Sequence, residues 1–302
     1  MLTQAVESYL GVRRSCGFEL RETGKYLRSF AAYSDARGKS YVRAETAIQW
    51  AGLARSASEG ARRLGQVIRF ARYMRAEDQH HELPPAVFGS GNPRRAIPYI
   101  FSRQDIEGLV QAAVHSRYRG LRRDTYSTFF ALLACTGLRV SEAIKLRYDD
   151  ITPDGLVIRC TKFRKSRLVP LHETTRDHLE RYLERRRRYY PFDDHVFVSM
   201  IGKPLRIDSV YTAFHAAARK IGLPCAPQRP RPTPHSLRHS FAVRALETCP
   251  DGRDRITQHM LALSTYLGHA KVADTYWYLT ATPELMRDIA ERSETFVKRE
   301  QP

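Results

Sequence analysis

The chain has 302 residues, which is enough for a sizeable core and, as a prior, for about two domains. Its 42% hydrophobic and 27% charged residues are typical of a globular protein, and no apolar run approaches the ~18 residues of a membrane span. The formal net charge is +18. Arginine outnumbers lysine and binds phosphate oxygens through two N–H groups at once, so the charge favours nucleic acid as a partner over a merely solvated basic surface.

The cysteines and the N-terminus indicate a compartment. Five cysteines are scattered through the sequence without a CxxC pair, so we expect free thiols in a reducing cytoplasm. The N-terminus shows no basic stretch followed by an apolar one, which is the pattern of a secretory signal. The sequence therefore predicts a cytoplasmic protein without membrane association, located at the nucleoid if its partner is DNA.

Residues 1–85 have apolar side chains at helical spacing, as in Tyr26, Leu27 and Phe30. We expect four helices in a small bundle that forms a separate domain. Arg72 lies among several arginines on the last of these helices. It fits contact with a DNA backbone, and a solvated helix face fits almost as well.

Residues 86–97 are the best linker candidate, because proline, glycine and serine cluster there and the helical periodicity is lost. Arg94 and Arg95 at its end are candidates for following a phosphate backbone. A second domain is expected over residues 98–302.

The first part of the second domain is predicted to be helical. Ser102 is expected to cap one helix and Asp124 another, which ends at Gly137. Arg139 then falls at the start of the next helix. An arginine after a glycine that ends a helix is, taken alone, more often a surface residue than a catalytic one.

Two short stretches predict a β-hairpin. Residues 156–160 alternate like a strand, and residues 167–171 look like its return. The tip between them carries three basic candidates for DNA contact or catalysis: Lys162, Arg164 and Lys165. The chain is therefore expected to be mainly α with a small antiparallel β-sheet, in two domains.

Helix signals resume at Thr174 and run into the four arginines of residues 185–188, which we interpret as a solvated helix end. Asp208 is expected to cap a further helix. A proline-rich basic loop over residues 224–234 carries Arg229 and Arg231, which are candidate DNA contacts.

The C-terminal part contains two helix boundaries. Thr233 is expected to cap a helix with Pro234 at its first position. A helix over residues 257–267 is expected to stop at Gly268. Asp274 or Thr275 is expected to cap the next one, and another is expected to begin at Thr282.

The side chains along these boundaries suit phosphoryl transfer. His235 and Arg238 are three residues apart at a helix start, where free backbone N–H groups favour an anion. Forked guanidinium groups stabilise the negative charge of a phosphoryl transition state, and a tyrosine can act as the nucleophile. Tyr276 and Tyr278 are both candidates, and spacing alone does not choose between them. Tyr278 is expected in about the first turn of the helix capped by Asp274 or Thr275, exposed to the positive end of that helix. His235 and His239 could also be a metal pair, but no glutamate lies between them as in HExxH.

Together these motifs resemble the tyrosine recombinase (phage integrase) family. The matching boxes are, in chain order, Thr136–Glu142, Lys162 with Arg167–Leu171, His235–Ala242 and Leu267–His269. Tyr278, nine residues after His269, stands where the family has its nucleophile, which favours Tyr278 over Tyr276. Residues 1–85 resemble the family's core-binding domain in helical character and length.

The resemblance implies a mechanism. Tyr278 would attack the scissile phosphate and form a 3′-phosphotyrosyl link. The phosphate oxygens would be held by Arg139, Arg238 and His269. His235 would assist proton transfer, and Lys162 would be the general acid.

The resemblance also implies partners and cofactors. The family works as a tetramer on two DNA duplexes, each held between the two domains of a protomer, and residues 283–302 would dock on a neighbouring copy. Accessory recombinases or DNA-bending proteins are possible partners. The resemblance implies neither ATP nor a metal, because the ester conserves the bond energy and arginines neutralise the charge. Phe163 and Arg164 depart from the glycine and small polar residue that are common at the hairpin tip.

Three other functions compete with DNA strand exchange. A type IB topoisomerase would use the same chemistry without a second duplex and without site preference. A DNA-binding regulator with a decayed site would be expected to have lost at least one of the matching residues. A zinc-dependent hydrolase would contain metal.

Overall fold

The chain, here a computed structural model, divides into two compact units, residues 1–96 and 97–302. The structure describes residues 1–89, 98–116, 118, 120–159, 166–190, 193–224, 231–248, 253–269, 273–276 and 278. Within these residues, no helix combines the length and the apolar character that a membrane span requires.

The first unit contains the four predicted helices, which are α1 (Leu2–Ser15), α2 (Arg21–Asp35), α3 (Ala44–Gly52) and α4 (Ala57–Glu77). Their apolar faces meet in one core, where the ring of Phe70 packs edge-on against Tyr9 and that of Phe30 against Trp50. The carboxylate of Asp35 accepts from the backbone N–H of Leu2 at 2.8 Å and so stabilises the start of α1. The unit therefore has a core of its own.

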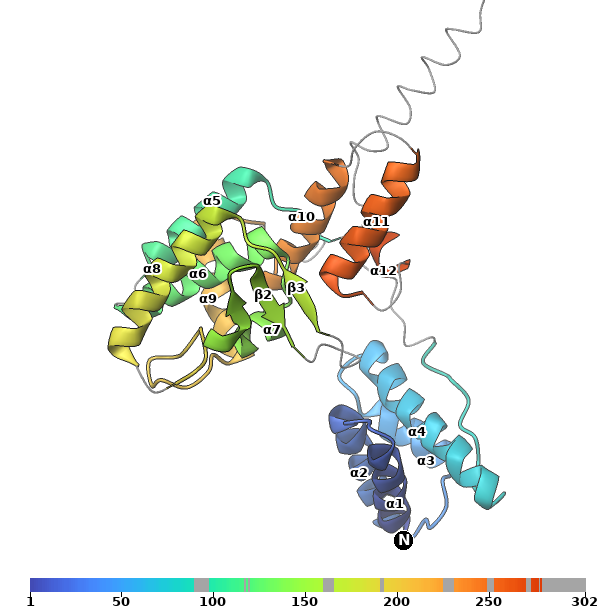
Figure 1. The fold of residues 1–302 in the computed structure, drawn as a ribbon. Helices are drawn as coiled ribbons and strands as arrows, with labels where there is room; N and C mark the ends of the chain where they lie inside the picture. Colours follow the sequence, from blue (N-terminus) through green and yellow to red (C-terminus); the bar gives the residue numbers. More distant parts are fainter. Residues whose placement is uncertain are drawn as a thin grey trace, which may run out of the picture. The chain divides into compact units, whose positions relative to one another are not determined.

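The second unit is mostly helical with one small sheet (Figure 1). Its helices are α5 (Arg103–Val114), α6 (Leu121–Thr136), α7 (Val140–Lys145), α8 (Glu173–Tyr189), α9 (Ile207–Lys220), α10 (Pro234–Glu247), α11 (Arg253–Leu267) and α12 (Ala273–Tyr276), with a short 3₁₀ turn η1 (Tyr148–Asp150). Its strands are β1 (Ile151–Thr152), β2 (Gly155–Ile158) and β3 (Arg167–Val169).

Helix α6 is the centre of the larger core, because most of its side chains, among them Phe129, Phe130 and Leu133, are buried. Helices α5, α8 and α10 pack around it. The strands form an antiparallel sheet in the order β1-β2-β3, with Ile158 opposite Arg167. The predicted hairpin is confirmed with shorter strands, and the register places Arg167 beside the end of β2.

A second core joins α10, α11 and the segment that follows them. Val243, Leu246, Leu263 and Leu267 pack there with Tyr278. Helix α11 also contacts α12 and β3, so the C-terminal helices lie beside the sheet (Figure 1). This arrangement brings the ends of α6, α10 and α11 together.

Two predicted caps are wrong for one physical reason. Ser102 does cap α5, in a capping box with Asp105. Asp124 and Asp208, however, lie inside the first turns of α6 and α9, which begin after Gly120 and Arg206. An acidic side chain is favourable in the first turn as well as at the cap, because both positions feel the positive end of the helix, so an aspartate alone does not fix the boundary.

The arginine run at the end of α8 is predicted to be a solvated helix end, but one of its members is buried. Arg186 is fully buried, with a side-chain exposure of 0%, whereas Arg185 beside it is exposed and pairs with Asp124. The Arg186 guanidinium donates to the carbonyls of Tyr190, Asp193 and His195 and to the Asp193 carboxylate. It therefore fastens the loop after α8 to the helix.

Candidate active site

Arg238 is held below the surface by the ends of two other helices. Thr233 and Pro234 start α10 as predicted, with a capping box to Ser236, and Arg238 follows in the second turn. Its side chain is only 1% exposed. Nη1 donates to the carbonyl oxygen of Gly137 at 2.7 Å, and Nη2 donates to that of Leu267 at 2.6 Å.

Gly137 and Gly268 end helices α6 and α11 as predicted, with φ of +60° and +65°. A Cβ on Gly137 would lie 2.6 Å from the ring of Phe241, so a larger residue would require that ring to shift. The carbonyl of Gly268 accepts from Nη2 of Arg139 at 3.0 Å, while that of Gly137 accepts from Arg238. Each glycine thus turns the backbone and presents its carbonyl to an arginine of another segment.

Glu142 connects Arg139 to a further arginine. Its carboxylate accepts from the backbone N–H of Arg139 at 2.9 Å and from Nη1 of the same residue at 2.7 Å. It also accepts two bonds from Arg167, at 3.0 and 2.8 Å. Burial opposes ionisation of Glu142, but the bonds from Arg167 and Arg139 outweigh it and lower the carboxyl pKa to about 2.

From the sequence, Arg167 is expected at the start of a strand and inside the matched stretch Arg167–Leu171, without a role of its own. The sequence does contain a signal for a functional role of Arg167, because this residue is charged and lies inside a matched motif next to the lysine hairpin. Arg167 also donates from Nε to the carbonyl oxygen of Tyr266 at 2.7 Å. The last carbonyls of α11 and the glycine after it, at Tyr266, Leu267 and Gly268, therefore each hold a different arginine.

We call Arg139, Arg167, Arg238 and Glu142 the arginine centre. It contains three guanidinium groups and one buried carboxylate, which Arg139 and Arg167 hold. Burial and the nearby Arg139 charge lower the pKa of Arg238 to about 10, which still leaves it protonated at neutral pH. Within the described residues the centre keeps an excess of positive charge, as a site for an anion requires.

Histidine rings surround Tyr278 next to this centre. The ring of His269 stacks on Tyr278, with centroids 5.9 Å apart, and the ring of His239 lies 5.4 Å from it on another side. His239 in turn packs edge-on against His235 at 4.6 Å. Imidazole and phenol side chains thus meet beside Arg238, although they come from α10, from the turn after α11 and from the segment after α12.

His235 and His269, to which the resemblance assigns roles, both have lowered pKa values. Burial and the charges of Arg238 and Arg139 lower the pKa of His269 to about 4. Partial burial, together with the charges of Arg238 and Arg139, also lowers the pKa of His235. Nδ1 of His269 lies 2.7 Å from Oγ1 of Thr275, a hydrogen bond that orients the ring.

The prediction that Tyr278 lies at a helix start is wrong. Helix α12 begins at Ala273, so Asp274 and Thr275 lie inside it, and Tyr278 follows its end. Its side chain is 3% exposed within the second core. Tyr278 is therefore placed by packing between rings and apolar side chains, and the dipole of a long helix does not act on it.

Several predicted residues lie elsewhere. Those outside the described residues are Lys162, Arg164, Lys165, Arg94, Arg95, Arg229 and the segment 279–302 with the helix expected at Thr282. The side chain of Tyr276 is also outside them, so the structure does not compare it with Tyr278. Arg231 is exposed shortly before α10. Arg72 is exposed on α4, in the other unit.

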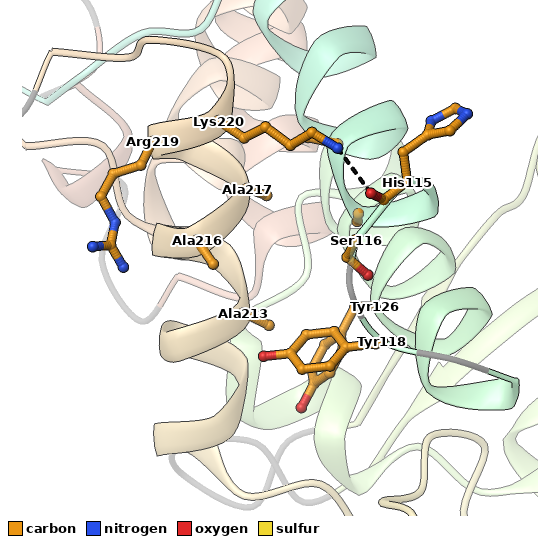
Figure 2. A pocket seen from close by; sticks show the side chains of 11 residues that line it. His115, Ser116, Tyr118, Tyr126, Ala213, Ala216, Ala217, Arg219 and Lys220 are labelled. Carbon is orange, nitrogen blue, oxygen red and sulfur yellow. Dashed lines mark hydrogen bonds between the residues drawn. The ribbon is translucent and has the colours of Figure 1, made fainter.

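A cavity of about 530 Å³ lies between α5 and α9, and none of the matched catalytic residues lines it (Figure 2). Its floor is alanine, including Ala113 and Ala217, and its rim contains Arg219 and Lys220. Nζ of Lys220 donates to the carbonyl of His115 at 2.8 Å (Figure 2). Both basic residues lie in the last turn of α9, where the helix dipole favours cations, so helix stabilisation explains the basic rim.

Comparison with known proteins identifies the class. The family model described as "Phage integrase family" matches residues 101–284 of this chain. The chain is 40% identical to y4rB of Sinorhizobium fredii, described as an integrase/recombinase, over 96% of each chain, and 29% identical to tyrosine recombinase XerD of Listeria innocua over 76% of this chain and 73% of the other.

Solved structures share the fold. A XerH site-specific recombinase bound to a palindromic difH substrate has a TM-score of 0.67 at 17% identity, covering 97% of this chain and 85% of that one. A lambda integrase tetramer bound to a Holliday junction has a TM-score of 0.64 at 17% identity, covering 92% and 76%. Fold and site define a tyrosine-type DNA recombinase that acts in site-specific recombination or integration. The chain belongs to the phage integrase family.

Proposed function

We propose that this chain cuts and rejoins DNA through a covalent 3′-phosphotyrosyl intermediate formed at Tyr278. The observation that carries the proposal is the convergence of the arginine centre and Tyr278, from distant parts of the sequence, on one point of the second unit. The excess positive charge suits a phosphodiester, and a phenol is a nucleophile that makes the step reversible.

Each reacting group has a role in this proposal. The Tyr278 oxygen attacks phosphorus, and the bond from phosphorus to the 5′ oxygen breaks. Arg139, Arg238 and His269 hold the non-bridging oxygens, because forked and neutral N–H donors stabilise the charge that develops there. His235 assists proton transfer from the phenol. Lys162 protonates the departing 5′ oxygen, and attack by a 5′ hydroxyl on the ester reverses the step.

The rest of the chain serves DNA binding in this proposal. Residues 1–85 form a core-binding domain, residues 86–97 a linker and residues 98–302 the catalytic domain. The candidate phosphate contacts are Arg72, Arg94, Arg95, Arg164, Lys165, Arg229 and Arg231. The DNA-bound relatives support double-stranded DNA as the substrate, and the lambda integrase tetramer supports assembly of four copies on two duplexes. Such work would take place at the nucleoid, with accessory recombinases or DNA-bending proteins as further partners.

A covalent capture experiment tests the nucleophile. DNA fragments trapped on the protein are sequenced to find the site, and a duplex nicked near the cleavage position is then used as a suicide substrate. We expect Tyr278→Phe to bind this DNA but to form no adduct on a denaturing gel, because the attacking oxygen is gone. Tyr276→Phe is the matched control and should still form it. An adduct with Tyr278→Phe would overturn the assignment.

A further inference from the structure

Arg167 is almost enclosed by the residues that it joins. Its side chain is 9% exposed and that of Glu142 is 8% exposed. It stands at the first position of β3, directly after the hairpin tip, yet its bonds go to α7 and to the end of α11. It therefore ties the sheet to two helices at one point.

The Glu142 carboxylate is shared evenly between two arginines. Oε1 accepts from Nη1 of Arg139 at 2.7 Å and from Nη1 of Arg167 at 3.0 Å. Oε2 accepts from the backbone N–H of Arg139 at 2.9 Å and from Nη2 of Arg167 at 2.8 Å. A carboxylate has about four acceptor positions, so these four bonds fill it and fix its plane.

Gly268 links the same two arginines from the other side. A Cβ there would lie 2.9 Å from Nη1 of Arg167, so the Arg167 guanidinium packs directly against the glycine. The carbonyl oxygen of Gly268 accepts from Nη2 of Arg139. Arg167 thus supports both groups that hold the Arg139 fork, the Glu142 carboxylate and the Gly268 carbonyl.

We infer that Arg167 is a positioning residue for the reaction: it holds Glu142 and Gly268 so that the Arg139 fork faces the scissile phosphate. The inference rests on the proposed function of Arg139. Arg167 does not need to touch DNA in this role. Lysine at position 167 keeps the charge but cannot make two parallel bonds to Glu142 and a third to Tyr266. The Glu142 carboxylate is then no longer held in one orientation.

The test is single-turnover cleavage of the nicked substrate at saturating protein, together with DNA affinity. We expect Arg167→Lys to slow cleavage by about 100-fold, since a misplacement of about 1 Å at a reacting group costs this much. DNA affinity should stay within about twofold, because no phosphate contact is lost. Arg186→Lys is the matched control: it also alters a buried arginine bound to a carboxylate and carbonyls, and should lower only the melting temperature.

A second variant keeps the test decisive if Arg167→Lys does not fold. Glu142→Gln/Arg167→Gln removes one negative and one positive charge together, so the net charge of the arginine centre is unchanged. It should fold, bind DNA and cleave as slowly as Arg167→Lys. Wild-type cleavage by either folded variant would overturn the inference, as would parallel losses of cleavage in Arg167→Lys and Arg186→Lys.

A modified substrate distinguishes defects in phosphate binding from defects in protonation of the leaving group. In a 5′-bridging phosphorothiolate the leaving thiolate needs no proton, so defects in the general acid are rescued and defects in phosphate holding are not. We expect no rescue of Arg167→Lys, and rescue would mean that Arg167 acts through the lysine hairpin. Failure of the proposed function itself shows separately, as an adduct that survives Tyr278→Phe.

Discussion

Two arginines of the second unit are buried almost completely, yet they differ in how their charge is met. Arg186 donates to three carbonyls and also to the carboxylate of Asp193 at 3.2 Å. Arg238 instead donates to the carbonyls of Gly137 and Leu267, and the nearby carboxylate of Glu142 is held by Arg139 and Arg167.

The difference separates a structural arginine from one kept for an anion. A buried charge is costly unless it is paired, and Asp193 provides that pairing for Arg186. The arginine centre has one carboxylate for three guanidinium groups, an excess of positive charge that suits the phosphate of the proposed reaction. Carbonyl groups orient both arginines. The two differ in that, among the residues that the structure describes, Arg186 has a carboxylate partner of its own and Arg238 does not.

Replacing each arginine by methionine, which is of similar length and uncharged, should separate these functions most strongly. We expect Arg238→Met to slow DNA cleavage by about 10³-fold or more, because one donor to the developing charge is lost. Its stability should fall less than that of Arg186→Met, because an uncompensated charge is removed while two carbonyls lose a donor. Comparable loss of cleavage in Arg186→Met would contradict the distinction.

Arg186→Met should instead act on folding. We expect the free energy of unfolding to fall by about 3 kcal/mol, because Asp193 and the loop carbonyls lose their buried partner. Urea unfolding followed by circular dichroism measures this change. A loss below about 1 kcal/mol would mean that the loop after α8 is held by other contacts.

Gly137→Ala tests the backbone that carries the carbonyl for Arg238. The positive φ and the approach of Phe241 should together lower the free energy of unfolding by about 2 kcal/mol. Gly222→Ala is the matched control, because Gly222 has φ of +70° but open space around it, and should cost less. Equal losses would show that Phe241 yields to the added methyl group.

The neutral state of His269 beside the arginines predicts a pH dependence. Its pKa is lowered from 6.5 to about 4 in the folded chain, so between these values the unfolded chain binds a proton that the folded chain does not. The stabilisation is therefore complete above pH 6.5 and is lost as the pH falls toward 4. His269→Gln should flatten this part of the stability curve, and an unchanged curve would contradict the shift.

The smallest effect is expected for an exposed arginine of the first unit. Arg72→Ala should weaken DNA binding uniformly and reduce the slope of log affinity against log salt by about 1, as for one lost phosphate contact. Arg62→Ala is the matched control, because Arg62 pairs with Glu59 on the same helix and should change the slope less. An unchanged slope in Arg72→Ala would place Arg72 away from the DNA.

The sequence predicts the parts of this architecture that depend on local rules. Helix periodicity, the Ser102 and Thr233 caps and the glycines at 137 and 268 are set by neighbouring residues, and the structure confirms them. The motif order also predicts which side chains matter, and Arg139, His235, Arg238, His269 and Tyr278 do lie in one region.

What the sequence does not predict depends on distant partners. Arg167 finds Glu142 and Tyr266, 25 and 99 residues away, and nothing local marks this choice. Arg186 differs from the exposed arginine before it only because a loop folds back onto it. Asp274 favours a helix start without fixing it, so the helix expected to begin at Asp274 or Thr275 begins at Ala273 instead, and Tyr278 follows its end.

The central claim is that the positive charge of Arg238 is reserved for the scissile phosphate. The most direct test of this claim uses a substrate that is neutral at that position. Single-turnover cleavage is measured for wild type and Arg238→Met on a normal phosphodiester and on a methylphosphonate at the scissile position. If Arg238 neutralises phosphate charge, the loss caused by Arg238→Met should shrink by about tenfold or more on the neutral substrate. An equal loss on both substrates would contradict this role and would make Arg238 a structural residue like Arg186.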